Sequence, residues 1–464
     1  MRRVALVLAV LVVAAAAGAI AYYRPDRAAR VATGFIAHTL CSSVFVSGLD
    51  ADEVYRESLA PTPGIRLITS GISYDVHKRR KTVAVTLFGN FEQDAVYRGE
   101  TGCVIAHEDE YIGPIMDQAK NEPIPVVLPA IDDTKIDSND KLKTALDRAF
   151  VEPDRPPHRN TKAIVVVHDG KIVAERYAAG VTADTRLLGY SLSKSVINAL
   201  VGVLVRDGKL TVDGPAPVGE WKDLSDPRHV ISIENLMRMT SGLDLDETNS
   251  GFDAASRILT LAGDMAGTAA RADLLALPGM RWAYSSPSTM ILSRIVKGAA
   301  GGQPESVLRL ARRELFAPLG MNNMTLEFDG AGTPVGAAFF LGTARDWARF
   351  GLLYLDDGVV GGKRILPEGW AKWSATATVE SDSGYAAGFW TNRGDSRGAQ
   401  ARVKLGMPAD SYYAGGSLGQ RIVIVPSANL VVVRLGASQD RPGFDIEATS
   451  RLVADVIAAL EKGS

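Results

Sequence analysis

The chain has few of the residues that build metal and redox sites. Among its 464 residues there are two cysteines, Cys41 and Cys103, and six histidines that show no ligand spacing. This scarcity argues strongly against a zinc site built on Cys/His motifs, and we expect neither a metal nor an organic cofactor. An excess of one charge is also lacking, because 51 Lys and Arg face 53 Asp and Glu, a net charge of −2. This balance gives no electrostatic case for a nucleic-acid partner.

Periodic and low-complexity segments are absent as well. The 45 glycines and 22 prolines follow no repeat, and 46% of the residues are hydrophobic. This composition argues against a collagen, a coiled coil or a disordered chain. The length allows about two or three globular domains.

The N-terminus reads as an export signal. Met1-Arg2-Arg3 precedes an apolar run from Val4 to Tyr23, which is longer than the apolar region of about 7–15 residues in a cleaved signal peptide. It reaches the length of about 20 residues that spans a bilayer. We expect residues 1–23 to form an uncleaved anchor, which would hold an exported, periplasmic or otherwise extracytoplasmic chain on the inner membrane. Ala19-Ile20-Ala21 keeps a cleaved signal peptide open as the alternative.

Outside the cytoplasm a disulfide can persist, so Cys41 and Cys103 can pair there. Two buried thiols explain the same two residues equally well.

Two regions follow the N-terminal segment. Residues 24–150 form an accessory region with a helix-like stretch over Ala28–Leu40 and strand-like segments over Thr82–Leu87 and Ala95–Tyr97. Pro- and Asp-rich stretches close this region, which places a boundary near residue 150.

Residues 151–464 begin and end with hairpins. Ala163–His168, the turn Asp169-Gly170 and Lys171–Ala174 form the first hairpin signal. The second pairs Arg421–Val425 with Leu430–Leu435, before a helical pattern over Ile446–Leu460. Mostly helical patterns lie between the hairpins. The sequence therefore predicts an α+β fold, an antiparallel sheet with an inserted helical cluster, preceded by the smaller accessory region and the apolar N-terminal helix.

The strongest chemical signal is a serine and a lysine three residues apart. Apolar residues keep a helical period from Val196 to Val205, so Ser191 falls at the N-terminus of the predicted helix and Lys194 one turn later. A lysine can take the proton of a serine if burial lowers its pKa, which makes the serine a nucleophile. An N-cap serine followed by a solvated lysine explains the same spacing.

Five segments in order resemble the serine β-lactamase and penicillin-recognising superfamily. They are Val166–Tyr177, Ser191–Lys194, Ile233–Leu243, Pro278–Ser286 and Tyr412–Gln420. Tyr-Tyr-Ala-x-Gly with a following Gly-Gln resembles the 6-aminohexanoate-dimer-hydrolase-like group, in the branch that holds class C β-lactamases and esterases. The resemblance covers roughly two-thirds of the chain, from Ala163 onward.

This resemblance implies a site for acyl transfer. Ser191 would be the acylated nucleophile, Lys194 its base partner and Tyr284 the carrier of a proton to the leaving group. Backbone amides of Ser191 and Ala414 would hold the oxyanion. The candidate residues for oxyanion and substrate binding are Ala414, Gly415, Ser286 and Tyr413.

Two departures from the family pattern bear on the substrate. Ser286 stands where the family has Asn, and Ser411–Tyr413 stand where it has Lys-Thr-Gly or His-x-Gly. A cation for a substrate carboxylate is thus lacking, so we expect a linear amide or ester rather than a β-lactam.

A rival nucleophile can be set aside. Gly415–Gly419 match G-x-S-x-G, but that elbow needs a following helix and a downstream histidine. A β-rich run follows here, and His229 is the last histidine.

Other polar and aromatic residues are less informative. Glu247 and its acidic neighbours Asp244 and Asp246 follow a Ser-Gly-Leu turn; they could line the pocket mouth, but we expect a solvated loop. The aromatic residues Trp282, Trp390 and Tyr412 fit pocket walls or core packing equally.

The sequence therefore predicts an exported serine hydrolase that cleaves a small amide or ester through an acyl-enzyme. A penicillin-binding D-Ala peptidase and a non-catalytic cell-envelope binding or sensor domain are the alternatives. The same three residues, Ser191, Lys194 and Tyr284, carry the catalytic hypothesis.

Overall fold

The computed structural model describes residues 18, 23–107, 115, 139–439 and 444–461. The predicted anchor over residues 1–23 lies almost entirely outside these residues, as do most of the Pro- and Asp-rich stretches before residue 140. None of the described helices is long and apolar enough to cross a membrane.

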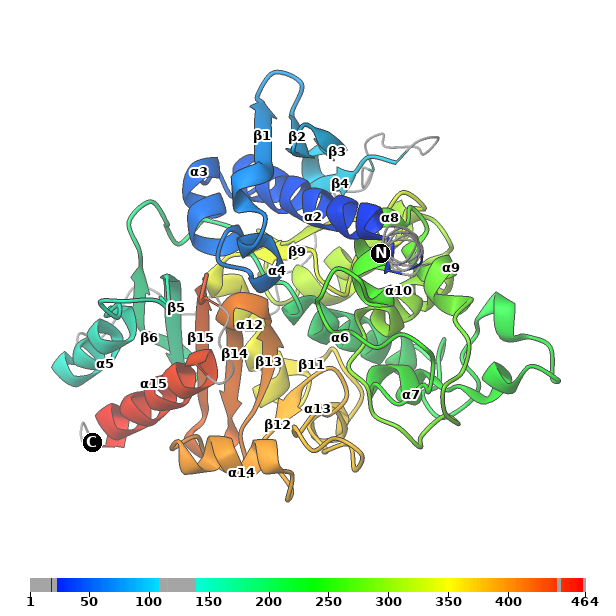
Figure 1. Ribbon diagram of the computed structural model, residues 1–464. Coiled ribbons are helices and arrows are strands. Elements are labelled where there is room, and N and C mark those ends of the chain that lie inside the picture. The colour runs from blue at the N-terminus through cyan, green and yellow to red at the C-terminus, as the bar shows by residue number, and fades with distance from the viewer. Residues whose placement is uncertain (1–17, 19–22, 108–114, 116–138, 440–443, 462–464) are drawn as a thin grey trace, which may run out of the picture.

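The N-terminal part packs one long helix against an antiparallel sheet with strand order β1-β2-β3-β4 (Figure 1). Its elements are α2 (Pro25–Phe45), α3 (Ala51–Val54), α4 (Pro63–Arg66), β1 (Ile72–His77), β2 (Thr82–Leu87), β3 (Asn90–Tyr97) and β4 (Cys103–Ile105). Apolar side chains of α2 and β2, such as Leu40 and Val83, share one buried cluster. Within this cluster a disulfide joins Cys41 to Cys103, with 6.1 Å between their Cα atoms.

The larger part is organised around an antiparallel sheet. Its described strands run in the order β12 (Trp390–Thr391), β13 (Tyr412–Gly416), β14 (Gln420–Val425), β15 (Leu430–Gly436), β5 (Thr161–His168) and β6 (Lys171–Tyr177). The strands β14, β15 and β5 are buried on both faces, which explains their nearly continuous runs of Val and Ile.

Both predicted hairpins are confirmed. β5 pairs with β6 and β14 with β15, each antiparallel. Asp169 and Gly170 have φ values of 49° and 72°, as a two-residue turn of type I′ requires. β15 also pairs with β5. Strands that are far apart in the sequence, near the start and the end of the larger part, therefore lie side by side in this sheet.

Helices cover both faces of the sheet. α6 (Leu192–Arg206) and α12 (Ala344–Leu355) pack on one face, whereas α5 (Asp140–Phe150) and α15 (Phe444–Glu461) pack together on the other (Figure 1). The remaining helices are α7 (Ile233–Met237), α8 (Ala254–Leu261), α9 (Met265–Ala270), α10 (Ser286–Ala300), α11 (Pro304–Ala311), α13 (Trp370–Ser374) and α14 (Arg397–Lys404). Because α5 packs against α15, residues 140–150 belong to the helical layer that covers this face of the sheet.

A small sheet connects the N-terminal part to the larger one. It runs β7 (Leu187–Leu188), β9 (Phe340–Gly342) and β8 (Thr325–Leu326), and a two-stranded ribbon, β10 (Val359–Val360) with β11 (Lys363–Arg364), lies apart from it. Glu327 follows β8 and is fully buried. Its Oε1 accepts hydrogen bonds from Ser42 Oγ at 2.8 Å and Cys103 N at 2.7 Å, and its Oε2 lies 3.0 Å from His38 Nε2. Through these contacts, one carboxylate joins α2 and β4 to the segment that follows β8.

Candidate active site

Ser191 lies where a strand gives way to a helix. β7 ends at Leu188, Tyr190 has φ 47°, and α6 begins at Leu192, so the chain turns sharply at this point. The Ser191 side chain makes no capping hydrogen bond to the helix backbone. Its Oγ instead lies 2.9 Å from Lys194 Nζ. The hydroxyl is therefore directed to the lysine, which the N-cap interpretation of the same spacing does not explain.

Lys194 is buried among oxygen atoms. Its side chain is at the core, with the residue only 3% exposed, and Nζ hydrogen-bonds Ser286 Oγ at 2.9 Å and Ala337 O at 2.7 Å. Burial lowers the pKa of Lys194 to about 8, while the negative charge of Glu247 acts in the opposite direction. A neutral amine can donate to the Ala337 carbonyl and still offer its lone pair to the Ser191 hydroxyl. The geometry thus fits a lysine base.

Tyr284 completes a group of three side chains. It lies two residues before the start of α10, and its ring centroid is 5.0 Å from Lys194 Nζ. Burial raises the pKa of Tyr284, and a hydrogen bond with Ser191 acts in the opposite direction. The phenol is therefore protonated at neutral pH and can donate a proton. The structure brings together the three residues that the resemblance named from separate motifs.

Glu247 also belongs to this group, although the sequence favoured a solvated loop. Its Oε2 accepts a hydrogen bond of 2.6 Å from the backbone N–H of Ser286, at the first turn of α10. Its charge raises the pKa values of both Lys194 and Tyr284. The neighbouring Asp246 instead pairs with Arg281. Glu247 therefore supplies the negative charge that acts on the base.

We expect Glu247→Gln to shift the pH dependence of activity. Lys194 acts as a base only when neutral, so kcat should rise with pH through its pKa of about 8. Removing the Glu247 charge lowers the pKa of Lys194 further, so the rising limb should move to lower pH. A kcat profile between pH 5 and 10 with a p-nitrophenyl ester measures this shift. Asp246→Asn is the matched control and should leave the limb in place; a Glu247→Gln profile identical to wild type would contradict this role.

The end of β13 lies against the nucleophile. The position of a Cβ on Gly416 would be 3.2 Å from Ser191 N and would clash with Gly189 O, so only glycine fits there. Ala414 is fully buried and pairs with Ile422 of β14. The backbone of β13 therefore passes directly beside the Ser191 amide, where the resemblance places the second oxyanion donor.

Tyr413 points away from Ser191. It lies in the hydrophobic cluster on the α15 face of the sheet, with the Arg402 guanidinium 5.4 Å from its ring centroid. Because side chains alternate along a strand, Tyr412 and Tyr413 face opposite sides, and Tyr412 is in the core, donating to Tyr354 O. The structure thus assigns neither tyrosine to the pocket wall next to the nucleophile.

Aromatic rings surround Tyr284 instead. Trp390 stacks on it with 5.9 Å between centroids, and Tyr385 meets it edge to face at 5.6 Å. Trp282 is tilted against Tyr385 at 6.0 Å. Of the candidate wall residues, Trp390 therefore packs directly on the Tyr284 ring, whereas Trp282 is linked to it through Tyr385.

The third family motif brings no cation to the site. Ser411 is fully buried and donates to Pro408 O at 2.6 Å. Over the described ranges, no group of three or more His, Cys, Asp or Glu side chains could hold a metal ion. The chemistry that Ser191, Lys194 and Tyr284 can perform together is proton transfer and nucleophilic attack.

A comparison with models of protein families shows which family the chain belongs to. The model described as Beta-lactamase matches residues 146–456, which include Ser191, Lys194 and Tyr284. The chain belongs to the Beta-lactamase family. Members of this family are serine hydrolases.

Similar proteins include hydrolases with different substrates. A 6-aminohexanoate-dimer hydrolase from Paenarthrobacter ureafaciens is 26% identical over 309 residues, 60% of this chain and 73% of that protein. A solved structure from Bacillus anthracis, provisionally described as a 6-aminohexanoate-dimer hydrolase, has a TM-score of 0.55 at 23% identity and covers 73% of this chain and 88% of its own. A family VIII carboxylesterase has a TM-score of 0.51 at 15% identity, covering 69% and 97%. The two solved structures show the fold that this Beta-lactamase-family chain shares.

Proposed function

We propose that the protein is a serine hydrolase that cleaves linear amides or esters through an acyl-enzyme on Ser191. The observation that carries this proposal is the placement of a buried lysine with a lowered pKa at 2.9 Å from a serine hydroxyl that caps no helix. The curated 6-aminohexanoate-dimer hydrolase relative supports an amide as substrate.

Acylation follows from this geometry. The Ser191 hydroxyl proton passes to Lys194 Nζ as Oγ forms a bond to the substrate carbonyl carbon. The carbonyl π electrons move to its oxygen, which the Ser191 amide and an amide at the end of β13 stabilise. When the tetrahedral intermediate collapses, the bond to the leaving amine or alkoxide breaks. Tyr284 gives that group its proton and recovers one from the Lys194 ammonium.

Deacylation reverses these roles. Water loses a proton to the same side chains as its oxygen attacks the acyl carbon, and the bond from Ser191 Oγ to that carbon then breaks. The proton returns to Oγ, which restores the free enzyme. Every atom and proton in both steps comes from substrate, water, Ser191, Lys194 or Tyr284.

The preference for linear substrates rests on the lack of a cation at the family's third motif. Arg421 is near enough for its charge to act on Tyr284, but it is paired with Asp445. A β-lactam carries a carboxylate, and the residues that align with the family's Lys-Thr-Gly are Ser411, Tyr412 and Tyr413, all buried and none cationic. An acyl group without a carboxylate does not need that partner.

A substrate panel tests the proposed function. With the full chain we expect turnover of p-nitrophenyl esters and of linear aliphatic anilides, and kcat/KM for nitrocefin at least about a hundredfold lower, the value of one good charged contact. Faster turnover of nitrocefin would contradict the preference. A stable penicillin adduct without turnover of any ester would instead favour a penicillin-binding peptidase.

We also propose that the protein acts outside the cytoplasm, anchored by its N-terminal segment. The apolar run from Val4 to Tyr23 and the disulfide between Cys41 and Cys103 support this location.

A further inference from the structure

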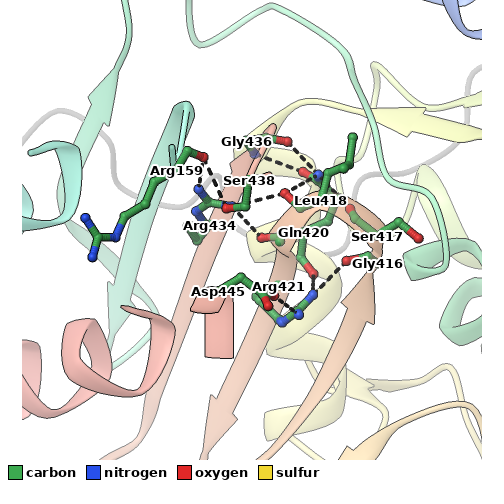
Figure 2. Close-up of polar contacts among 11 residues, drawn as sticks. Arg159, Gly416, Ser417, Leu418, Gln420, Arg421, Arg434, Gly436, Ser438 and Asp445 are labelled. Atoms are coloured by element: carbon green, nitrogen blue, oxygen red, sulfur yellow. Dashed lines mark hydrogen bonds and ion pairs between the residues drawn. The ribbon is translucent and has the colours of Figure 1, made fainter. Parts of the chain in front are cut away.

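The turn between β13 and β14 is held by side chains at every residue. The carbonyls from Gly416 to Gln420 each accept a hydrogen bond from one of three side chains, those of Gln420, Arg421 and Arg434 (Figure 2). Arg421 donates to Gly416 O and to Gln420 O, each at 2.7 Å, and pairs with Asp445. Side-chain donors therefore satisfy every one of these carbonyls, and they hold the turn in one conformation.

Gln420 joins this turn to the next strand. The residue is buried, with 1% of its surface exposed. Nε2 donates to Ser417 O at 3.0 Å and to Gly436 O at 2.6 Å, and Oε1 accepts from Gly436 N at 3.0 Å. The side-chain amide therefore uses both its donor and its acceptor groups, and it connects the turn to the end of β15.

Arg434 joins the same turn to the start of β5. It is 5% exposed, and Nη1 donates to Gly419 O at 2.9 Å while Nη2 donates to Arg159 O at 2.6 Å and Thr161 Oγ1 at 3.1 Å. Burial lowers the pKa of Arg434 to about 10, which still leaves it charged at neutral pH. A buried cation whose hydrogen bonds go to carbonyl and hydroxyl oxygens is costly, although the charges of Asp445 and Glu152 offset part of that cost. This arrangement therefore calls for a reason.

The reason lies on the other side of the turn. Gly416 lies against the Ser191 amide, and Leu418 has φ 58°, a left-handed conformation that costs energy for a residue with a side chain. The side chains of Gln420 and Arg434 fix the carbonyls on both sides of Leu418, because Gln420 donates to Ser417 O and Arg434 to Gly419 O. If this part of the turn relaxed, the end of β13 would be free to move relative to Ser191.

We propose that Gln420 and Arg434 are positioning residues, which set the distance between the end of β13 and Ser191 and thereby the strength of the oxyanion hole. They touch neither substrate nor the reacting atoms. This inference rests on the proposed function of Ser191. It predicts that loss of either side chain weakens transition-state stabilisation without changing the base.

Gln420→Met and Arg434→Met test this role in the full chain, with Arg434→Lys as the conservative variant. Removing one oxyanion donor costs about 10²–10³ in kcat, and a misplaced donor should cost less. We therefore expect kcat for a p-nitrophenyl ester to fall about 10–100-fold per folded molecule, with KM changed less than threefold. Affinity for an aryl boronic acid, which forms a tetrahedral adduct, should fall by a similar factor. The rising pH limb set by Lys194 should not move, and Arg434→Lys should recover part of the rate.

Arg228→Met is the matched control. Arg228 also donates to two backbone carbonyls, Ala270 O and Ala272 O, but in the helical part of the fold. Its loss should lower stability and leave kcat per folded molecule within twofold. Circular dichroism and urea unfolding give the folded fraction of each variant, and Gln420→Met, nearly equal in volume, is the variant expected to fold best.

Two results would overturn the inference. One is kcat and boronate affinity of Gln420→Met within twofold of wild type. The other is an equal loss of kcat in Arg228→Met, which would show a general effect of stability. Failure of the proposed function looks different, because wild type itself would then neither turn over the ester nor bind the boronate.

Discussion

Replacement of Lys194 by alanine is expected to lower kcat for a p-nitrophenyl ester by about a thousandfold, within the range measured for loss of a general base. Lys194 Nζ is the proton acceptor at 2.9 Å from Ser191 Oγ, and it also hydrogen-bonds Ser286 Oγ. Without it the hydroxyl keeps its ordinary pKa and is a weak nucleophile. Steady-state kinetics at pH 9, where the wild-type lysine is mostly neutral, measures the loss.

Two further variants separate chemistry from charge and packing. Lys194→Arg keeps a cation but cannot act as a base at this pH, so it should be as inactive as the alanine variant. Lys297→Ala removes a lysine that donates to Ala331 O outside the site and should leave kcat within twofold. Retention of more than a tenth of wild-type kcat in Lys194→Ala would show that another group takes the serine proton.

Glu327→Ala is expected to lower the free energy of unfolding by about 3 kcal/mol or more, because each buried polar group left without a partner costs about 1–3 kcal/mol. The change leaves Cys103 N–H, the Ser42 hydroxyl and His38 Nε2 without their shared carboxylate in the core. It also opens a cavity where α2 packs on the strands next to β7. Urea unfolding of the oxidised protein, followed by tryptophan fluorescence, measures the loss.

Glu314→Ala provides the comparison. Glu314 pairs with Arg206 at the surface, with 29% of its side chain exposed, so its loss should cost about 0–1 kcal/mol. Equal unfolding midpoints for the Glu327 and Glu314 variants would show that the N-terminal part contributes little to the stability of the larger part.

The nucleophile and its base could be predicted from the sequence because they lie on one helix. Three residues of spacing and a helical period bring Ser191 and Lys194 to the same face, and the structure places them together. The hairpins could be predicted for the same reason, since a turn such as Asp169-Gly170 is a local signal. These features depend on neighbours in sequence.

The rest of the site depends on contacts that no local pattern encodes. Glu247 lies 39 residues before Ser286, and it accepts a hydrogen bond from the backbone N–H of that residue. In the sequence, an acidic loop that lines a site has the same pattern as an acidic loop that faces water. In the sequence, Arg434 is a single charged residue within an apolar strand. Its hydrogen-bond partners lie in the turn and just before another strand, so the sequence does not show them. The alternation of Tyr412 and Tyr413 is evident from the sequence, but which of them faces the helices is decided only by how the sheet packs.

The central claim is that Ser191 is acylated, and intact-mass analysis after treatment with a fluorophosphonate tests it most directly. We predict one adduct per molecule of wild-type full chain, located by peptide mapping on Ser191, and none on Ser191→Ala. Ser417→Ala, which changes the serine of the G-x-S-x-G segment, should be labelled like wild type. A folded wild type that remains unlabelled, or an adduct that persists in Ser191→Ala, would contradict the account.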